Sequence, residues 1–422
     1  MNYKKITLKN GLRILTIPMK NTQTATFMIM VGVGSRFESE KESGLSHFIE
    51  HMMFKGTEKR PTTLAISEEL DSVGGEFNAF TGKDMTAYYA KSDAKHLGVS
   101  LDVITDMFLN SKIEEAEIER EKGTIIQELN MYEDTPLRNV GDVFENLLYP
   151  KNALGRDIVG NKKSIESFKR GDFKRYMADH YIPQNTVVCV AGNIKEKDVM
   201  KEVEKRLSRM AKGKKVKFEK LIEVQKSPQL SIKKKKTDQT HLDLGFRTFG
   251  YDHKDRFALA LLSTILGGNM SSRLFIEIRE KKGLAYSVRT FVEAFQDAGY
   301  LAMYAGVEHK KLELTIETAL QEFKKMATEK VSLKELKNAK DYLKGKAVMN
   351  FESSDEVAMF FIDQEIKKKK IMNLSEILGR IEKVSADDIL CVAKKVFRPE
   401  RLNLAIIGPH KDTDKIKKLL KF

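Results

Sequence analysis

The sequence repeats itself weakly at an offset of 216 residues, and this repeat constrains the fold more than any other feature. Near the start of each half, residues 24–34 (TATFMIMVGVG) align with residues 240–250 (THLDLGFRTFG), and both alternate like half-buried strands before a glycine turn. Near the end of each half, residues 172–192 align with residues 388–408, each typical of a helix, a proline break and a buried strand. A single offset at both ends predicts two homologous domains.

The basic stretch between the repeats lacks strong apolar periodicity, which is typical of a linker. We therefore predict an N-terminal domain at residues 1–212, a linker at residues 213–226 and a C-terminal domain at residues 227–422. Strands are expected largely as hairpins, because Asn10-Gly11 is a tight-turn signal and Gly82-Lys83 separates two alternating segments. The predicted fold class is α+β, with an antiparallel-rich sheet packed with helices in each domain.

The net charge of +14 and the lysine runs at residues 233–236 and 367–370 raise the question of a nucleic-acid partner. The second run closes an expected amphipathic helix that begins near Asp355, where cations complement the carbonyl end of the helix dipole. The first run follows the predicted linker, and no nucleic-acid motif accompanies either run. We interpret both as solvated charge and expect no nucleic acid as a partner.

The first twenty residues lack the apolar segment of a secretory signal, because Lys9, Asn10 and Arg13 interrupt it. No stretch approaches 18 uninterrupted apolar residues, so no membrane partner is expected. The two cysteines, Cys189 and Cys391, sit in apolar surroundings that favour buried free thiols over a disulfide. These features fit a reducing compartment, and a cytoplasmic location is the expectation.

Residues 43–56 (SGLSHFIEHMMFKG) form the sharpest local motif and predict a short helix. His47 and His51 are four residues apart on one helix face, so both imidazoles can reach one ion, and Glu50 lies beside them. Two histidines at this spacing can also be core residues with satisfied hydrogen bonds. The arrangement H-x-x-E-H is, however, the inverzincin signature, which requires a third ligand from elsewhere in the chain.

A charged segment at residues 113–136 predicts a helix on which Glu121 and Glu128 stand seven residues apart, two turns along one face. The H-x-x-E-H motif, followed 77 residues beyond His51 by Glu128 within E-x6-E, resembles the pitrilysin, insulinase and mitochondrial processing peptidase family. The segments LKNGLRIL, GGEFNAFTGKD, LGRDIVG and REKKGLAYSV also look like family segments, in family order.

The resemblance implies one zinc ion per chain, held by His47, His51 and Glu128, although nitrogen and oxygen ligands accept several divalent metals. Glu50 is then the base that takes a proton from water, and Glu121 supports the metal site from behind its ligands. The implied activity is that of a zinc metalloendopeptidase. The alternative is a non-catalytic structural or partner subunit, since some relatives have lost catalysis.

Two further groups match family residues that meet the substrate. Arg279 and Tyr286 correspond to an arginine and a tyrosine that reach the reacting bond, where they are expected to stabilise developing charge. Phe77, Asn78 and Ala79 correspond to an edge strand to which an extended peptide adds as a further strand. The alternatives are packing roles for Arg279 and Tyr286 and an ordinary hairpin at residues 77–81.

At the 216-residue offset the metal motif faces Ser263, Leu266 and Gly267, so the second domain cannot bind zinc in the same way. In the family two such domains form half of a clamshell chamber that admits short or unfolded peptides. The expected partners are therefore the peptide substrate and a second chain, in a homodimer or in a heterodimer with a homologous chain. The resemblance does not extend to a preference for basic presequences. Mitochondrial relatives have two acids where this chain has Arg138 and Asp142, so only one acid is present.

Overall fold

The computed structural model describes residues 2–367 and 370–422 and divides into two compact units. Unit 1 comprises Met1–Leu129, Arg156–Glu219 and Ala347–Leu374, and unit 2 comprises Asn130–Gly155, Lys220–Lys346 and Ser375–Phe422. Each unit thus combines most of one half of the chain with a segment from the other half. Two contiguous halves joined by a linker do not describe this arrangement, whose cause is the pair of exchanged helices described below.

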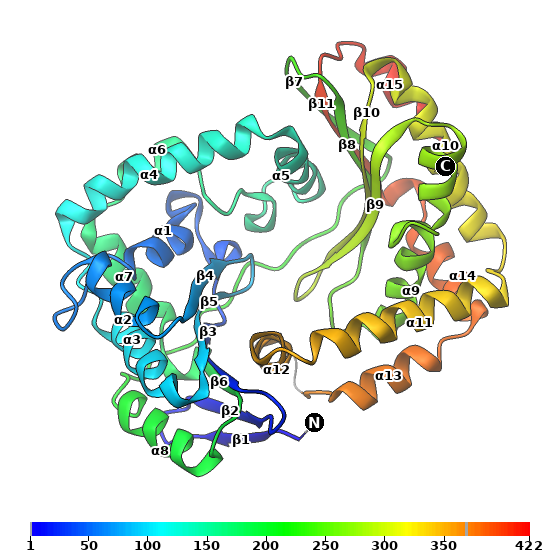
Figure 1. Cartoon of the computed structure of the whole chain (residues 1–422). Helices are drawn as coiled ribbons and strands as arrows, with labels where there is room; N and C mark the ends of the chain where they lie inside the picture. The colour runs from blue at the N-terminus through cyan, green and yellow to red at the C-terminus, as the bar shows by residue number, and fades with distance from the viewer. Residues whose placement is uncertain (1, 368–369) are drawn as a thin grey trace. The chain divides into compact units, whose positions relative to one another are not determined.

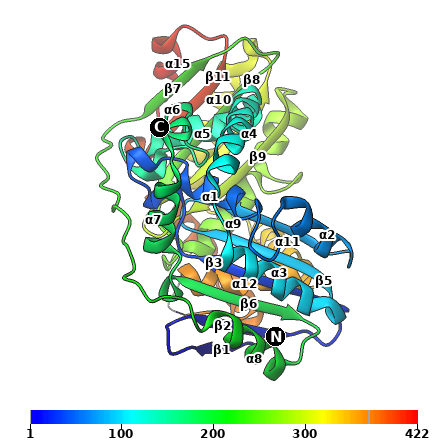
Figure 2. The same ribbon diagram turned by 90° about the vertical axis from the view of Figure 1, so that its left-hand side faces the viewer.

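Unit 1 is built on a mixed sheet with the strand order β1-β2-β6-β3-β5-β4. Figure 2 labels the strands from β1 to β5 in this order. Its strands are β1 (Lys4–Thr7), β2 (Arg13–Pro18), β3 (Thr24–Val31), β4 (Glu76–Thr81), β5 (Thr86–Asp93) and β6 (Thr186–Gly192). Both predicted hairpins occur, β1 with β2 and β4 with β5, and Gly11 adopts a positive φ of 98° in the first of them. Strand β4 lies at the edge of the sheet, next to β5.

Helices cover both faces of this sheet. They are α1 (Leu45–Met52), α2 (Thr63–Asp71), α3 (Leu97–Asn110), α6 (Lys162–Ser167), α7 (Arg170–His180), α8 (Glu196–Leu207), α12 (Ser354–Lys367) and the first part of α4 (Glu115–Asp134). Successive side chains of a strand point to opposite faces of the sheet, so the core has a part on each face. Tyr88 points toward Phe108 of α3, whereas its neighbour Ala87 belongs to the cluster that packs on α12. The lysine run predicted to close this last helix extends beyond Lys367 to Lys368 and Lys369, which lie outside the described residues.

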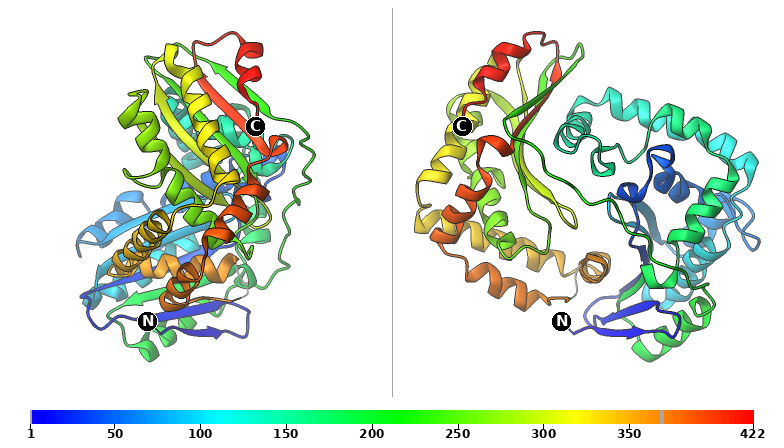
Figure 3. Two further views of the ribbon diagram at one scale, coloured as in Figure 1. Left: turned by 90° about the vertical axis from the view of Figure 1, so that its right-hand side faces the viewer. Right: turned by 180° about the vertical axis from the view of Figure 1, so that it is seen from behind.

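Unit 2 repeats the same plan, with the strand order β7-β11-β8-β10-β9. Figure 3 shows β11 as an orange-red strand beside the green β7. Its strands are β7 (Gln229–Lys234), β8 (Thr240–Thr248), β9 (Ala285–Ala294), β10 (Gly299–Val307) and β11 (Leu402–Gly408). Its helices include α5 (Pro136–Leu148), α9 (Arg256–Gly267), α10 (Leu312–Thr328), α11 (Leu333–Asn350), α13 (Leu374–Glu382), α14 (Ala386–Val396) and α15 (Thr413–Leu419). Strand β11 pairs parallel with β7 and antiparallel with β8, as β6 pairs with β2 and β3. This confirms the predicted α+β class and the two homologous domains.

Helices α5 and α12 occupy the same place in the two repeats, and each covers the sheet formed mainly by the other half of the chain (Figure 1). Helix α5 packs on β8 and β11 through Val140, Phe144 and Leu148, which recur every four residues on one face. Helix α12 packs on β3 and β6 through its own apolar side chains. The two segments are therefore exchanged reciprocally between the units.

One acidic side chain is buried beneath α5 in unit 2. Asp243 of β8 is only 2% exposed, and its Oδ1 has no hydrogen-bond partner among the described residues. Burial raises the pKa of this carboxyl to about 7, and the charge of Arg289 opposes that rise only in part. Because the folded state then holds a proton that the unfolded chain has released, stability falls as the pH rises from about 4 to about 7.

Asp243→Asn is accordingly expected to stabilise the protein by about 2 kcal/mol at pH 8 and to change little at pH 4. Urea unfolding of both proteins at the two pH values measures this difference. A variant less stable than wild type at pH 8 would contradict the assignment of Asp243 as a strained buried acid.

Cysteine burial follows the prediction at one position and not at the other. Cys189 is buried in β6, but Cys391 is exposed, because it lies on the face of α14 opposite its apolar side chains Ile389, Val392 and Val396. Within residues 2–367 and 370–422, no helix has both the length and the apolar character that crossing a membrane would require.

Candidate functional site

Helix α1 carries the H-x-x-E-H motif and is fixed at its start by a glycine and a buried acid. Gly44 has a φ of 95°, and a Cβ at this position would lie 2.4 Å from the carbonyl oxygen of Val159. Only glycine satisfies both conditions. The carboxylate of Glu38 accepts hydrogen bonds from the backbone amides of Gly44 (2.8 Å) and Ser46 (2.7 Å). These contacts hold the first turn of α1 in one position. The helix spans Leu45–Met52, so it is shorter than the predicted helix.

Three side chains from α1 and α4 converge on one point. Nε2 of His47 lies 3.6 Å and Nε2 of His51 lies 3.4 Å from Oε2 of Glu128. One ligand atom from each residue lies within 4.8 Å of the other two. Two imidazole nitrogens and a carboxylate oxygen are the donor set of catalytic zinc sites that leave one position to water. The residues present therefore fit a zinc ion.

The two histidines differ in their electrostatic surroundings. Burial and the neighbouring ring of His51 lower the pKa of His47 to about 4. Burial also disfavours a charged His51, but hydrogen bonds to Glu121 and Glu128 outweigh it and raise the pKa of His51 to about 9. Because a metal needs the neutral ring, a bound cation must displace the proton from His51.

Glu121 and Lys55 stand directly behind the ligand group. Nδ1 of His51 lies 2.9 Å from Oε1 of Glu121, and Nζ of Lys55 lies 2.6 Å from its Oε2. Glu121 is only 4% exposed. Burial alone would raise its pKa, but the bonds to His51 and Lys55 hold it below the usual range. An ionised Glu121 fixes the orientation of the His51 ring, as carboxylates commonly do beside metal sites.

Glu50 faces an open pocket beside the ligand group. The pocket is lined by Glu50, His51, Phe54, Lys55, Phe77, Asn78 and Glu121. Burial raises the pKa of Glu50, and a hydrogen bond from Thr81 partly offsets that rise. The pocket thus joins the carboxylate of Glu50, the ligand His51 and the edge strand β4, which supplies Phe77 and Asn78.

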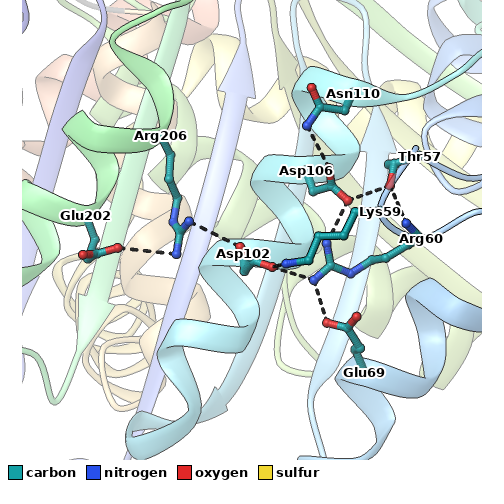
Figure 4. A network of polar contacts seen from close by, with 9 residues as sticks. All are labelled: Thr57, Lys59, Arg60, Glu69, Asp102, Asp106, Asn110, Glu202 and Arg206. Carbon is teal, nitrogen blue, oxygen red and sulfur yellow. Dashed lines mark hydrogen bonds and ion pairs between the residues drawn. The ribbon is translucent and has the colours of Figure 1, made fainter.

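The loop that follows α1 is anchored by a buried arginine (Figure 4). The guanidinium of Arg60 is 2% exposed and donates to Asp106 (2.8 Å) and Asp102 (2.6 Å) of α3 and to Glu69 (2.6 Å) of α2. Thr57 adds a hydrogen bond to Asp106. A buried cation with several acidic partners holds the chain after α1 against α2 and α3, so the motif is fixed at both ends.

The remaining predicted residues lie in unit 2. Arg279 belongs to the π-helix Phe275–Lys281, and Tyr286 belongs to β9. Arg279 donates to the backbone oxygen of Tyr286 (2.9 Å), and its guanidinium lies 4.7 Å from the centre of the Tyr286 ring. Tyr286 is 79% exposed. The two residues thus form one pair with an exposed aromatic ring. Arg138 and Asp142 lie on α5.

Two neighbours of the site escaped the sequence analysis. Lys55 follows His51 by four residues, so helical spacing could have placed it beside Glu121. Thr81 ends the FNAFT segment, but its contact with Glu50 spans 31 residues of sequence and no local pattern indicates it.

Comparison with known proteins places this geometry in context. Residues 13–162 match the family profile described as insulinase (peptidase family M16), and residues 167–343 match the M16 inactive domain. The uncharacterized zinc protease YmxG of Bacillus subtilis is 36% identical over 96% of this chain and 98% of that protein. An uncharacterized zinc protease of Rickettsia bellii is 36% identical over 97% of this chain and 98% of that protein.

Solved structures agree on the fold. A protease from Helicobacter pylori superposes with a TM-score of 0.91 at 24% identity, over 97% of this chain and 100% of that chain. The relatives from Bacillus subtilis and Rickettsia bellii are named zinc proteases, and the chain carries a His/His/Glu group able to take a metal ion. From the two matched domains and the full-length relatives it follows that the chain belongs to the insulinase family of peptidases, M16.

Proposed function

We propose that this protein is a zinc endopeptidase that hydrolyses peptide bonds in short or unfolded chains. The observation that carries the proposal is the convergence of His47, His51 and Glu128 within 4.8 Å, beside a pocket that also contains Glu50. The family membership and the names of the relatives support it.

When bound there, zinc would polarise the peptide carbonyl and lower the pKa of a water molecule to about 7. Glu50 accepts the proton of that water as it attacks, and then delivers it to the departing amine nitrogen. Burial shifts the pKa of Glu50 upward, toward neutral pH. A residue that acts first as base and then as acid works best when its pKa lies near the working pH. Glu121 holds the His51 ring in its ligating orientation throughout.

Substrate binds as an extended strand along β4 in this proposal. The edge position of β4 supports it, because an edge strand offers backbone donors and acceptors without demanding a particular sequence. Phe77, Asn78 and Ala79 are the residues that would receive the peptide backbone and its side chains. Phe77 and Asn78 also line the pocket beside Glu50, which connects peptide binding with the reacting bond.

Arg279 and Tyr286 are proposed to stabilise the charge that develops on the peptide oxygen. Their pairing and the exposure of Tyr286 support this role, because the phenol is available to a ligand. We expect Tyr286→Phe to lower kcat by about 10-fold or more with zinc content unchanged. Wild-type kcat in this variant would assign the tyrosine to packing.

A second chain is proposed as partner, identical or homologous, because two domains make half of the chamber that the family resemblance implies. Light scattering coupled to size exclusion tests it. A fully active monomer would overturn the dimer.

The activity itself is tested on the purified protein with metal analysis and a library of quenched fluorescent peptides. We expect about one zinc per chain, cleavage of unstructured peptides, loss of cleavage after chelation and its return with added zinc. A zinc-loaded protein that cleaves no peptide in the library would overturn the proposal in favour of a structural or partner subunit.

A further inference from the structure

Thr81 ends the edge strand β4, and its hydroxyl donates a 2.5 Å hydrogen bond to Oε2 of Glu50. We propose that Thr81 is a positioning residue that fixes the Glu50 carboxylate relative to β4. This inference rests on the proposed function, since it takes Glu50 as the proton acceptor. With Oε2 held by Thr81, Oε1 is the oxygen left to accept the proton of the water.

The backbone of Thr81 is fixed by the tight turn that follows it. The amide of Gly82 donates to the carbonyl of Met85 (2.8 Å), which closes the hairpin. The amides of Ser35 and Arg36 donate to the carbonyls of Gly82 and Lys83, both at 3.1 Å. The position of the Thr81 hydroxyl is therefore set by backbone hydrogen bonds and not by a flexible loop.

Buried charge and close packing strengthen the same turn. The guanidinium of Arg36 lies 3.4 Å from the carboxylate of Asp84, and the two residues are 1% and 3% exposed. A Cβ on Gly34 would lie 2.1 Å from the carbonyl oxygen of Gly82, so the two backbones touch where only glycine fits. This anchor fixes the backbone of Thr81. The hydrogen bond from the Thr81 hydroxyl therefore restricts the rotation of the Glu50 side chain.

A second contact joins β4 to the turn that follows α1, on the same side of the strand. Phe77 and Thr81 are four residues apart, so their side chains point to the same face of β4. The ring of Phe77 stacks on that of Phe54 with a centroid distance of 6.4 Å and an interplanar angle of 29°. Phe54 follows Glu50 by four residues. The edge strand and the carboxylate therefore belong to one rigid frame.

The consequence is that a peptide added to β4 is placed in the same frame as the group that takes the proton. A carboxylate released from Thr81 can rotate about its side-chain bonds and lose its alignment with the water. Misplacement by about 1 Å can cost on the order of 100-fold in rate. Ground-state binding of the peptide through β4 is unaffected, because the hydroxyl contacts Glu50 and the substrate contacts the strand.

The matched pair Thr81→Val and Thr81→Ser separates the hydroxyl from the shape of the side chain. For Thr81→Val, which keeps the shape, we expect kcat to fall by about 10- to 100-fold, with KM, zinc content and the melting midpoint close to wild type. For Thr81→Ser, which keeps the hydroxyl, we expect kcat within about threefold of wild type. Wild-type kcat in Thr81→Val, or equal losses in both variants, would overturn the inference.

Peptide affinity supplies a readout that does not depend on turnover. In a Glu50→Gln background, adding Thr81→Val should leave the Kd of a zinc-loaded complex with an uncleaved peptide within about twofold. A Kd that rises about 10-fold or more would make Thr81 a substrate-binding residue and overturn the positioning role.

Two outcomes keep this inference distinct from the proposed function. A zinc-loaded wild type without peptidase activity defeats the function, whereas an active wild type matched by Thr81→Val defeats only the positioning role. Should Thr81→Val fail to fold, Thr81→Ala takes its place with the same criteria for kcat, KM and Kd.

Discussion

Glu50→Gln is expected to lower peptide hydrolysis by up to about 10⁴-fold, because general acid–base catalysis contributes about 10²- to 10⁴-fold and glutamine cannot accept the proton. Zinc content should stay at about one ion per chain. Glu50 is not one of the three side chains that converge within 4.8 Å, and glutamine keeps its size and an oxygen that accepts the Thr81 hydroxyl. Turnover of a quenched peptide and metal analysis of the same sample measure the two effects.

The matched control is Glu58→Gln, which removes an equal charge at an exposed position seven residues beyond His51. Its turnover should equal that of wild type. Full activity in Glu50→Gln would remove Glu50 from the mechanism, and loss of zinc from that variant would instead make it a ligand.

Glu128→Gln is expected to weaken zinc binding by more than about 100-fold, beyond the range seen when partners behind the ligands are removed. Glu128 supplies the carboxylate of the ligand group, 3.6 Å and 3.4 Å from the two histidines. A neutral amide cannot replace this charge, so His47 and His51 would hold the ion alone. Zinc titration against a chromophoric chelator gives the affinity, and peptide turnover should fall with zinc occupancy.

A second substitution that removes a negative charge from α4 is the control for Glu128→Gln. Glu119 of α4 is exposed and pairs with Lys122, so Glu119→Gln should bind zinc as wild type does. If Glu128→Gln retains wild-type affinity, the ligand assignment fails, even with activity lost.

The internal repeat predicts most of the fold. Residues 172–192 and 388–408 were predicted as helix, proline break and buried strand, and they form α7 with β6 and α14 with β11. The convergence of His47, His51 and Glu128 could also be predicted from the sequence, because helical spacing and the E-x6-E motif are local patterns and the family resemblance connects them.

Contacts between distant segments could not be read in the same way. The apolar faces of α5 and α12 indicate that each helix packs on something, but amphipathicity does not encode which sheet receives it. Thr81 and Glu50 meet because a hairpin and a helix pack together, and neither residue stands out in its own segment. The predicted burial of Cys391 is wrong for a related reason. Its neighbours in sequence are apolar, but Cys391 itself lies on the exposed face of α14.

The exchange of α12 also has a consequence during synthesis on the ribosome. The last strand of the first sheet ends at Gly192, but the helix that covers its apolar face begins at Ser354. At about 5 to 20 residues per second, the interval lasts roughly 10 to 30 s. During that time the nascent chain displays side chains such as Met28 and Val187 that the finished protein hides. Holding chaperones should therefore associate with this chain late in translation, after its metal motif has already emerged.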